Sequence, residues 1–357
     1  MSDLEKEFKE VNSIFEKDKY IQVNPDINIK DIEGFDLYKK VKHAGRDLYV
    51  LFHSKGASLN RKVPGKIYVK ASVEEALLKL SPKVKAKETE NLIDTLTQIL
   101  LEDHFKSKIL DNNELELEKK IELTVHCAGE VMKKIFESGK FDHFDLKTIM
   151  KLSESLCYLI DLIFQDHRAL NLLLNETIGH DYKLYTHCVN VSLFSGLLAM
   201  ELGNDVFHGA GTEALKTLIT GALIHDIGKM LIDSKIFDKK GPLSPKEFEE
   251  IKRHPVYGIK LVEPESLPEE VHQIILQHHE KWTGGGYPQN LSYQQISNFA
   301  RIACISDVFD ALTTKKPYRP ALKPFEALLL MKQKMIGKFY HPYLNVFIKF
   351  LGKGSQK

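Results

Sequence analysis

Hydrophobic positions recur at helical spacing through most of the chain beyond about residue 86. Leu117, Ile121 and Val125 form one such series, and the stretch "DLKTIMKLSESLCYLIDLIF" carries another. From about residue 178 onward each segment shows the same pattern, with short polar loops between segments. The pattern predicts a mainly α-helical protein. We expect a helical domain over residues 178–357, and a helical linker or subdomain over 86–177, with a packed subdomain favoured.

The first 85 residues show a different pattern. Short runs rich in β-branched and aromatic residues, among them "FDLYKKV", "RDLYVLF" and "KIYVKA", are broken by Asn-Pro, Ala-Gly and Pro-Gly pairs. Such runs predict short strands, and "SVEEALLKL" predicts a helix with a capped start. We therefore expect a small α/β module over residues 1–85, ahead of the helical regions.

Composition limits the classes of protein and partner. A chain of 357 residues is long for one core, so two or three domains are expected. The net charge of +1 argues against a DNA or RNA polymer as partner. The four cysteines lie far apart in apolar helical patterns, which is typical of reduced thiols in a cytoplasmic protein. A charged start and the lack of a long uncharged apolar run predict neither a signal peptide nor a membrane span.

Ionisable residues interrupt the apolar segments of the C-terminal half. In "GALIHDIGKM" a histidine and an aspartate stand side by side at the end of a hydrophobic run, and "VHQIILQHHE" ends in two histidines. Any one of these histidines alone is best explained as a core or capping residue. Burying several of them together costs several kcal/mol unless they are paired or bind metal, so their joint pattern favours a metal site. The candidates are His187, His225, Asp226, His254, His278, His279 and Asp307.

At this point the sequence resembles a known family. The motif "HDIGK", with a histidine upstream and an aspartate downstream, is similar to the HD superfamily of metal-dependent phosphohydrolases. The segment "HHEKWTGGGYP" narrows the resemblance to the HD-GYP subfamily of cyclic-di-GMP phosphodiesterases. The stretches "GPLSPKEFEEIKRHPVYG", "ARIACISDVFDALTT" and "KKPYRPA" agree with it. The resemblance runs from about His180 to Leu351, roughly half the chain, and implies an HD-type helical bundle.

The resemblance also implies a ligand set and a reaction. One metal ion would be held by His187, His225, Asp226 and Asp307. Asp226 would bridge to a second ion held by His254 and His278, with His279 completing the cluster. The metals implied are iron or manganese, while the mixed ligands do not exclude zinc, nickel or cobalt. A hydroxide between the two metals would hydrolyse cyclic-di-GMP to linear pGpG, with GMP as the product of a second cleavage.

Lys183 is where the chain departs from the three-metal members of this family. Those members have a glutamate four residues before the first histidine, and here that position is a lysine. A protonated ammonium cannot bind a metal and would oppose a third cation, so a two-metal site is expected, with Lys183 near its edge. Asp310, three residues after Asp307, is either a hydrogen-bond acceptor for a ligand or a helix-surface residue.

Further residues are assigned to catalysis and substrate by the same resemblance. Lys229 shares a helix face with His225 and Asp226, so with Asp226 it is a candidate catalytic residue whose charge would neutralise a phosphate oxygen. The expected substrate-binding residues are Gly286, Tyr287, Pro288, Lys316 and Arg319.

Two other functions remain open. The chain could instead sense cyclic-di-GMP without useful turnover, or hydrolyse another cyclic dinucleotide. The resemblance further implies that the N-terminal module regulates or dimerises the catalytic half. A homodimer and a signalling protein bound through the GYP loop are therefore additional expectations.

Overall fold

The structure of the protein, a computed structural model, is described at residues 20–22, 37–43, 46–53, 67–70, 106–113, 115–203, 211–237, 239, 241–262, 267–316 and 319–354. The chain divides into two compact units. The first combines Met1–Gln98 with Ser107–Glu116, and the second combines Ile99–Lys106 with Leu117–Lys357. The two units are described separately below.

The first unit contains a small antiparallel sheet. Its strands are β1 (Tyr20–Gln22), β2 (Leu37–His43), β3 (Arg46–His53) and β4 (Ile67–Lys70). They lie in the order β1-β4-β2-β3, and a tight hairpin joins β2 to β3, whose ends pair His43 with Arg46. The predicted strands are thus present. The helix expected in "SVEEALLKL" lies outside the described residues.

The second unit is helical, which confirms the predicted fold class. Its longer helices are α4 (Leu117–Glu137), α5 (His143–Gln165), α6 (His167–Thr177), α7 (Leu184–Leu202), α9 (Gly211–Ile224), α14 (Asn298–Thr313), α15 (Pro324–Lys334) and α16 (His341–Gly354). Shorter elements are η3 (Ile227–Leu231), α10 (Ser234–Phe237), α11 (Pro245–Ile251), α12 (His254–Leu261), α13 (Glu269–Gln277) and η5 (Tyr293–Gln295). Between the two units' main segments, Lys106–Leu110 forms a single π-helical turn, η2, of which Ser107–Leu110 belong to the first unit. Among the helices that the structure describes, none is long and apolar enough to cross a membrane.

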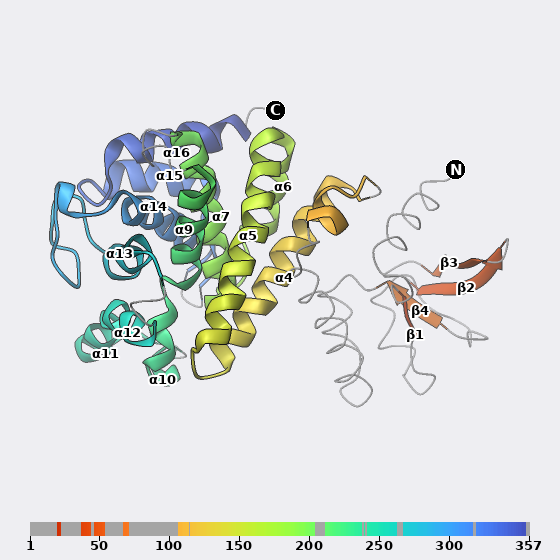
Figure 1. Cartoon of the computed structure of the whole chain (residues 1–357), viewed down its shortest axis with the longest axis horizontal. Coiled ribbons are helices and arrows are strands. Elements are labelled where there is room, and N and C mark those ends of the chain that lie inside the picture. The colour runs from red at the N-terminus through yellow and green to blue at the C-terminus, as the bar shows by residue number, and fades with distance from the viewer. Residues whose placement is uncertain are drawn as a thin grey trace. The chain divides into compact units, whose positions relative to one another are not determined.

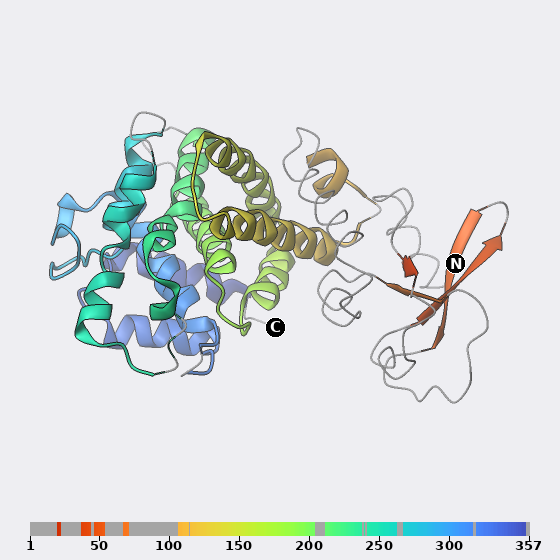
Figure 2. The same cartoon turned by 90° about the horizontal axis from the view of Figure 1, so that it is seen from below.

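Helix α7 lies at the centre of the second unit. It is buried from His187 to Ala199, and it contacts α4, α5, α9, α14 and α16. Helices α4, α5, α6 and α7 lie side by side (Figures 1 and 2). A buried hydrogen bond between Ser153 of α5 and Thr220 of α9 joins this group to the following helices. The helices of the expected 86–177 region therefore pack on those of the C-terminal domain, while the boundaries at residues 85 and 177 remain predictions.

An aromatic cluster fixes the helices that carry the candidate ligands. Phe194 of α7, Phe309 of α14 and Phe347 of α16 are fully buried. Phe309 makes edge-to-face contacts with Phe194 at 5.1 Å and with Phe347 at 5.2 Å between ring centroids. Each such contact contributes about 0.5–1.5 kcal/mol beyond area burial. Since Phe194 is two helical turns from His187, this packing also sets where that histidine points.

Candidate metal centre

Two groups of ligand-type side chains converge in the second unit. The first comprises His187 from the start of α7, His225 from the turn after α9, and Asp307 from α14. The second comprises Asp226, His254, His278 and His279. Within each group the ligand atoms all lie within 4.8 Å of one another. The structure thus brings all seven sequence candidates into one site.

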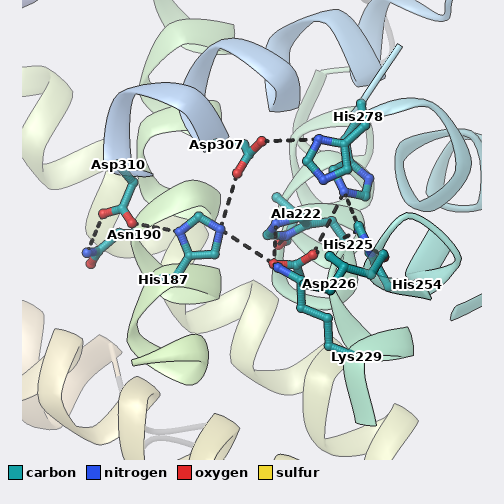
Figure 3. Close-up of polar contacts among 12 residues, drawn as sticks. His187, Asn190, Ala222, His225, Asp226, Lys229, His254, His278, Asp307 and Asp310 are labelled. Atoms are coloured by element: carbon teal, nitrogen blue, oxygen red, sulfur yellow. Dashed lines mark hydrogen bonds and ion pairs between the residues drawn. The ribbon is translucent and has the colours of Figure 1, made fainter. Parts of the chain in front are cut away.

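Asp226 lies between the two groups. Its Oδ1 is 3.2 Å from Nε2 of His254, whereas its Oδ2 is 3.4 Å from Nε2 of His225 and 3.6 Å from Nε2 of His187 (Figure 3). The two oxygens of one carboxylate therefore face different histidine sets. This is the arrangement of a carboxylate that can bridge two cations.

The outer nitrogens of the histidines are held by the surrounding backbone. Nδ1 of His225 lies 2.7 Å from the carbonyl oxygen of Ala222, and Nδ1 of His254 lies 2.7 Å from that of Ile251. Nδ1 of His278 is likewise 3.0 Å from the carbonyl oxygen of Ile274 in α13. Because a carbonyl oxygen only accepts, each Nδ1 carries the proton and each Nε2 presents a lone pair to the site.

The polar atoms at the centre fit a divalent cation. Among the described residues, His225 Nε2 and Asp226 Oδ1 are buried and make no hydrogen bond. Buried polar atoms are normally satisfied, and a lone pair on nitrogen beside a carboxylate oxygen is a ligand pair that divalent metals accept. The side chains present therefore suit a divalent metal ion.

Burial keeps most of the imidazoles neutral. It lowers the pKa of His254 to about 4 and that of His279 to about 3, and holds the pKa of His278 well below its usual value. Burial also works against the charged form of His187, but hydrogen bonds to two aspartates raise its pKa to about 9. A cation bound by His187 therefore displaces a proton, whereas the other three histidines are ready to ligate at neutral pH.

Lys229 is the counterion of Asp226. Its ammonium donates to Asp226 Oδ2 at 2.5 Å, and its side chain is only 14% exposed. Burial disfavours both charges, but the lysine and nearby histidines hold the pKa of Asp226 well below its usual value. Burial likewise lowers the pKa of Lys229, yet the carboxylate raises it above its usual value. Both groups are therefore charged at neutral pH, and the ammonium lies beside the metal ligands.

Asp310 orients the first histidine of the site. It is fully buried, and its Oδ2 lies 2.6 Å from Nδ1 of His187. Its other oxygen accepts from the side-chain amide of Asn190 at 2.7 Å. The sequence reasoning missed Asn190, although its position three residues after His187 places it on the same helix face.

Asp310→Asn is expected to weaken metal binding about 10- to 100-fold, since the amide removes the charge that orients and strengthens His187 as a ligand. Competition with a chelator measures the affinity. Asp161→Asn is the control, because Asp161 is an exposed aspartate on α5. Equal metal affinities for the two variants would contradict the role of Asp310.

The three glycines before Tyr287 are required for different structural reasons. Gly284 and Gly285 have φ of +88° and +77°, which favours glycine. A Cβ on Gly286 would lie 2.5 Å from the Cα of Glu280, so this residue is small because the loop folds back on its own chain. The buried Glu280 carboxylate then accepts from two backbone amides that follow the loop, at 2.7 and 3.0 Å. Glu280 was missed by sequence reasoning, and it anchors the loop.

Tyr287 forms the wall of the site next to the second ligand group. Its ring lies 4.7 Å from that of His279, tilted by 33°, and 6.4 Å from that of His254. The ammonium of Lys252 lies 5.8 Å from the same ring. Pro288 follows through a cis peptide bond. The loop expected to bind substrate is therefore in contact with His279, a candidate metal ligand.

Lys316 and Arg319, the two basic candidates after α14, contact different groups. The guanidinium of Arg319 donates to the carbonyl oxygens of Ala311 and Leu312 at 2.6 and 3.0 Å, which satisfies the end of α14. Lys316 instead places its ammonium 4.7 Å from the ring centre of Tyr182. In this structure Arg319 holds the helix end, and Lys316 is the basic residue beside the site.

Lys183 lies at the N-cap of α7. Its side chain is exposed, and its ammonium lies 5.8 Å from the ring centre of Tyr185. The neighbouring Tyr182, which sequence reasoning missed, has its ring 5.4 Å from that of His187. In this segment Tyr182, and not Lys183, is therefore the residue seen in contact with the candidate ligand His187.

Comparisons with known proteins show what the helical part of the chain is similar to. A family model described as "HD domain" matches residues 207–342. A "Cyclic di-GMP phosphodiesterase" of Thermotoga maritima is 32% identical over 53% of this chain and 50% of its own length. A second, from Pseudomonas aeruginosa, is 34% identical over 53% of this chain and 44% of its own. A "3'3'-cGAMP-specific phosphodiesterase 1" of Vibrio cholerae is 34% identical over 50% of this chain and 40% of its own. The chain thus spans about half the length, or less, of these relatives.

A solved structure shares the fold. It is described as an HDG"Y"P protein from Bdellovibrio bacteriovorus, with a TM-score of 0.57 and 18% identity over 93% of this chain and 99% of that chain. At this identity the likeness concerns the fold alone. Residues 207–342 match an HD domain, and the ordered motifs, the ligand geometry around Asp226 and the curated relatives all make this half of the chain similar to HD-GYP phosphodiesterases.

Proposed function

We propose that the chain is a metal-dependent phosphodiesterase that hydrolyses cyclic-di-GMP to linear pGpG, and that its site holds two divalent ions, iron or manganese. The observation that carries the proposal is the position of Asp226, with one oxygen toward each histidine group. Curated relatives named as cyclic-di-GMP phosphodiesterases support the substrate.

Different residues of the chain have different roles in the proposed reaction. Divalent ions in such a site supply an activated water and a Lewis acid for the phosphoryl group. Asp226, Asp307 and the imidazoles of the two groups would hold them, with Asp310 keeping His187 in place. Lys229 offers its charge to a phosphoryl oxygen or to the departing ribose oxygen. Tyr287 closes the side of the site next to His279.

Removal and return of metal test the activity. Protein treated with a chelator is expected to be inactive, and reloading with Fe(II) or Mn(II) is expected to restore conversion of cyclic-di-GMP to pGpG, because the ligands remain in place. Chromatography identifies the products, and elemental analysis measures bound metal. Metal-loaded protein that leaves the nucleotide intact would overturn the proposal, and saturable binding without product would favour a sensor.

A second substrate is favoured by a specific observation. Several relatives from Vibrio cholerae, 30–34% identical, are named 3'3'-cGAMP-specific phosphodiesterases. Parallel kcat/KM measurements on cyclic-di-GMP and 3'3'-cGAMP decide between the substrates. The same assays show whether pGpG is cleaved on to GMP.

A further inference from the structure

Tyr182 is held in place by pairing between two chain segments. Its backbone N–H donates to the carbonyl oxygen of Lys315 at 2.9 Å, and the N–H of Lys315 donates to that of His180 at 2.9 Å. The N–H of Gly179 donates to the carbonyl oxygen of Thr313 at the same distance. These bonds join the segment before α7 to the end of α14, the helices that carry His187 and Asp307. The position of Tyr182 is therefore fixed relative to the metal ligands.

The side chain of Tyr182 lies between a metal ligand and a cation. Its ring is 5.4 Å from the ring of His187, and the ammonium of Lys316 lies 4.7 Å from its centre. Burial raises the pKa of Tyr182, while the charge of Lys229 works in the opposite direction. A tyrosine hydroxyl is protonated at neutral pH even at its ordinary pKa, so it is available to donate a hydrogen bond.

Two ammonium groups approach the site on this side. Burial, followed by the charge of Lys229, lowers the pKa of Lys316. Lys229 is paired with Asp226, whereas the ammonium of Lys316 lies against the ring of Tyr182. The phosphoryl oxygens of a nucleotide match both ammonium groups and the phenol donor between them and His187.

We propose that Tyr182 binds the phosphoryl group of the substrate, with its hydroxyl donating to a non-bridging oxygen while Lys229 and Lys316 supply the charge. The nucleotide substrate class rests on the proposed function. The anion-binding role rests on the contacts of Tyr182 itself. The ligand chemistry is that of a phosphate ester, and inorganic phosphate is its simplest probe.

Tyr182→Phe in the full-length, metal-loaded protein tests the proposal, because it removes only the hydroxyl. Calorimetric titration with inorganic phosphate is expected to show roughly tenfold weaker binding, as for loss of a hydrogen bond to a charged group. KM for cyclic-di-GMP should rise by a similar factor, with a much smaller change in kcat. Tyr185→Phe is the matched control, since Tyr185 is as half-buried as Tyr182 and also lies beside a lysine ammonium, but that of the exposed Lys183.

A double variant tests whether the groups act together. Tyr182→Phe combined with Lys316→Met should weaken phosphate binding by less than the product of the two single effects, because both side chains contact the same anion. If Tyr182→Phe bound phosphate as tightly as Tyr185→Phe does, the proposal would be overturned. It would also be overturned by loss of bound metal from Tyr182→Phe, which would make the residue a support for His187, or by wild-type protein that binds no phosphate. Phosphate binding can be measured without turnover. If the protein proved inactive but Tyr182→Phe still weakened phosphate binding, only the proposed function would be contradicted.

Discussion

Asp226→Asn is expected to lower kcat/KM for cyclic-di-GMP roughly a thousandfold and to deplete bound metal. The amide keeps the shape of the side chain but replaces one ligand oxygen with an N–H donor and removes the charge. Since the two oxygens of Asp226 face His225 and His254, both ligand groups lose a partner in one substitution. Lys229 also loses its counterion and becomes a buried cation without a carboxylate.

Steady-state kinetics together with elemental analysis of the purified variant measure this effect. Asp233→Asn is the control, because Asp233 is an exposed aspartate seven residues further along the chain. An Asp226→Asn protein that keeps full metal content and most of its activity would show that the carboxylate does not bridge the two groups.

Gly228→Ala is expected to destabilise the protein by about 3 kcal/mol or more and to release metal. A Cβ at this position would lie 1.9 Å from the carbonyl oxygen of His254 and 2.3 Å from the backbone nitrogen of Gly258. Both neighbours are backbone atoms, so no side chain can rotate away. Helix α12 would have to move from η3, and His254, its first residue, would move with it.

Chemical denaturation of the metal-loaded and metal-free proteins measures the loss of stability. Gly129→Ala is the matched control. Gly129 lies inside α4, where a Cβ would meet nothing within 4 Å, so alanine should be neutral or stabilising by roughly 0.5–1 kcal/mol. If Gly228→Ala unfolded within about 0.5 kcal/mol of wild type and retained its metal, the close packing of η3 on α12 would not be required.

The sequence was sufficient for the helical fold class and for the choice of ligand candidates. Helical periodicity is a local property, so it predicted the helices that the structure describes beyond residue 116. Adjacent ionisable residues in "HDIGK" and "QHHE" stood out because burying them separately would be costly. All seven ligand candidates meet in one site.

The sequence did not reveal which residues support the ligands. Tyr182, Asn190 and Glu280 belong to ordinary polar and aromatic positions, and their roles depend on neighbours that are far away in the chain. Gly286 and Arg319 were both expected to bind substrate, which stays a prediction. The contacts that the structure shows for them are structural: Gly286 lets the loop pack on Glu280, and the guanidinium of Arg319 is bonded to the end of α14.

The sequence alone therefore determined the residue types of the metal site and the helices that carry them. Tertiary structure decided how their atoms face one another. His187 and Asp310 are 123 residues apart, yet their side chains share a 2.6 Å hydrogen bond. Only the packing of α7 against α14, through buried side chains such as Phe194 and Phe309, brings them together. The packing of α7 on α9 and of α12 on η3 gives each oxygen of Asp226 its own set of histidines. Such long-range contacts, unlike helical periodicity, are not encoded in any short stretch of chain.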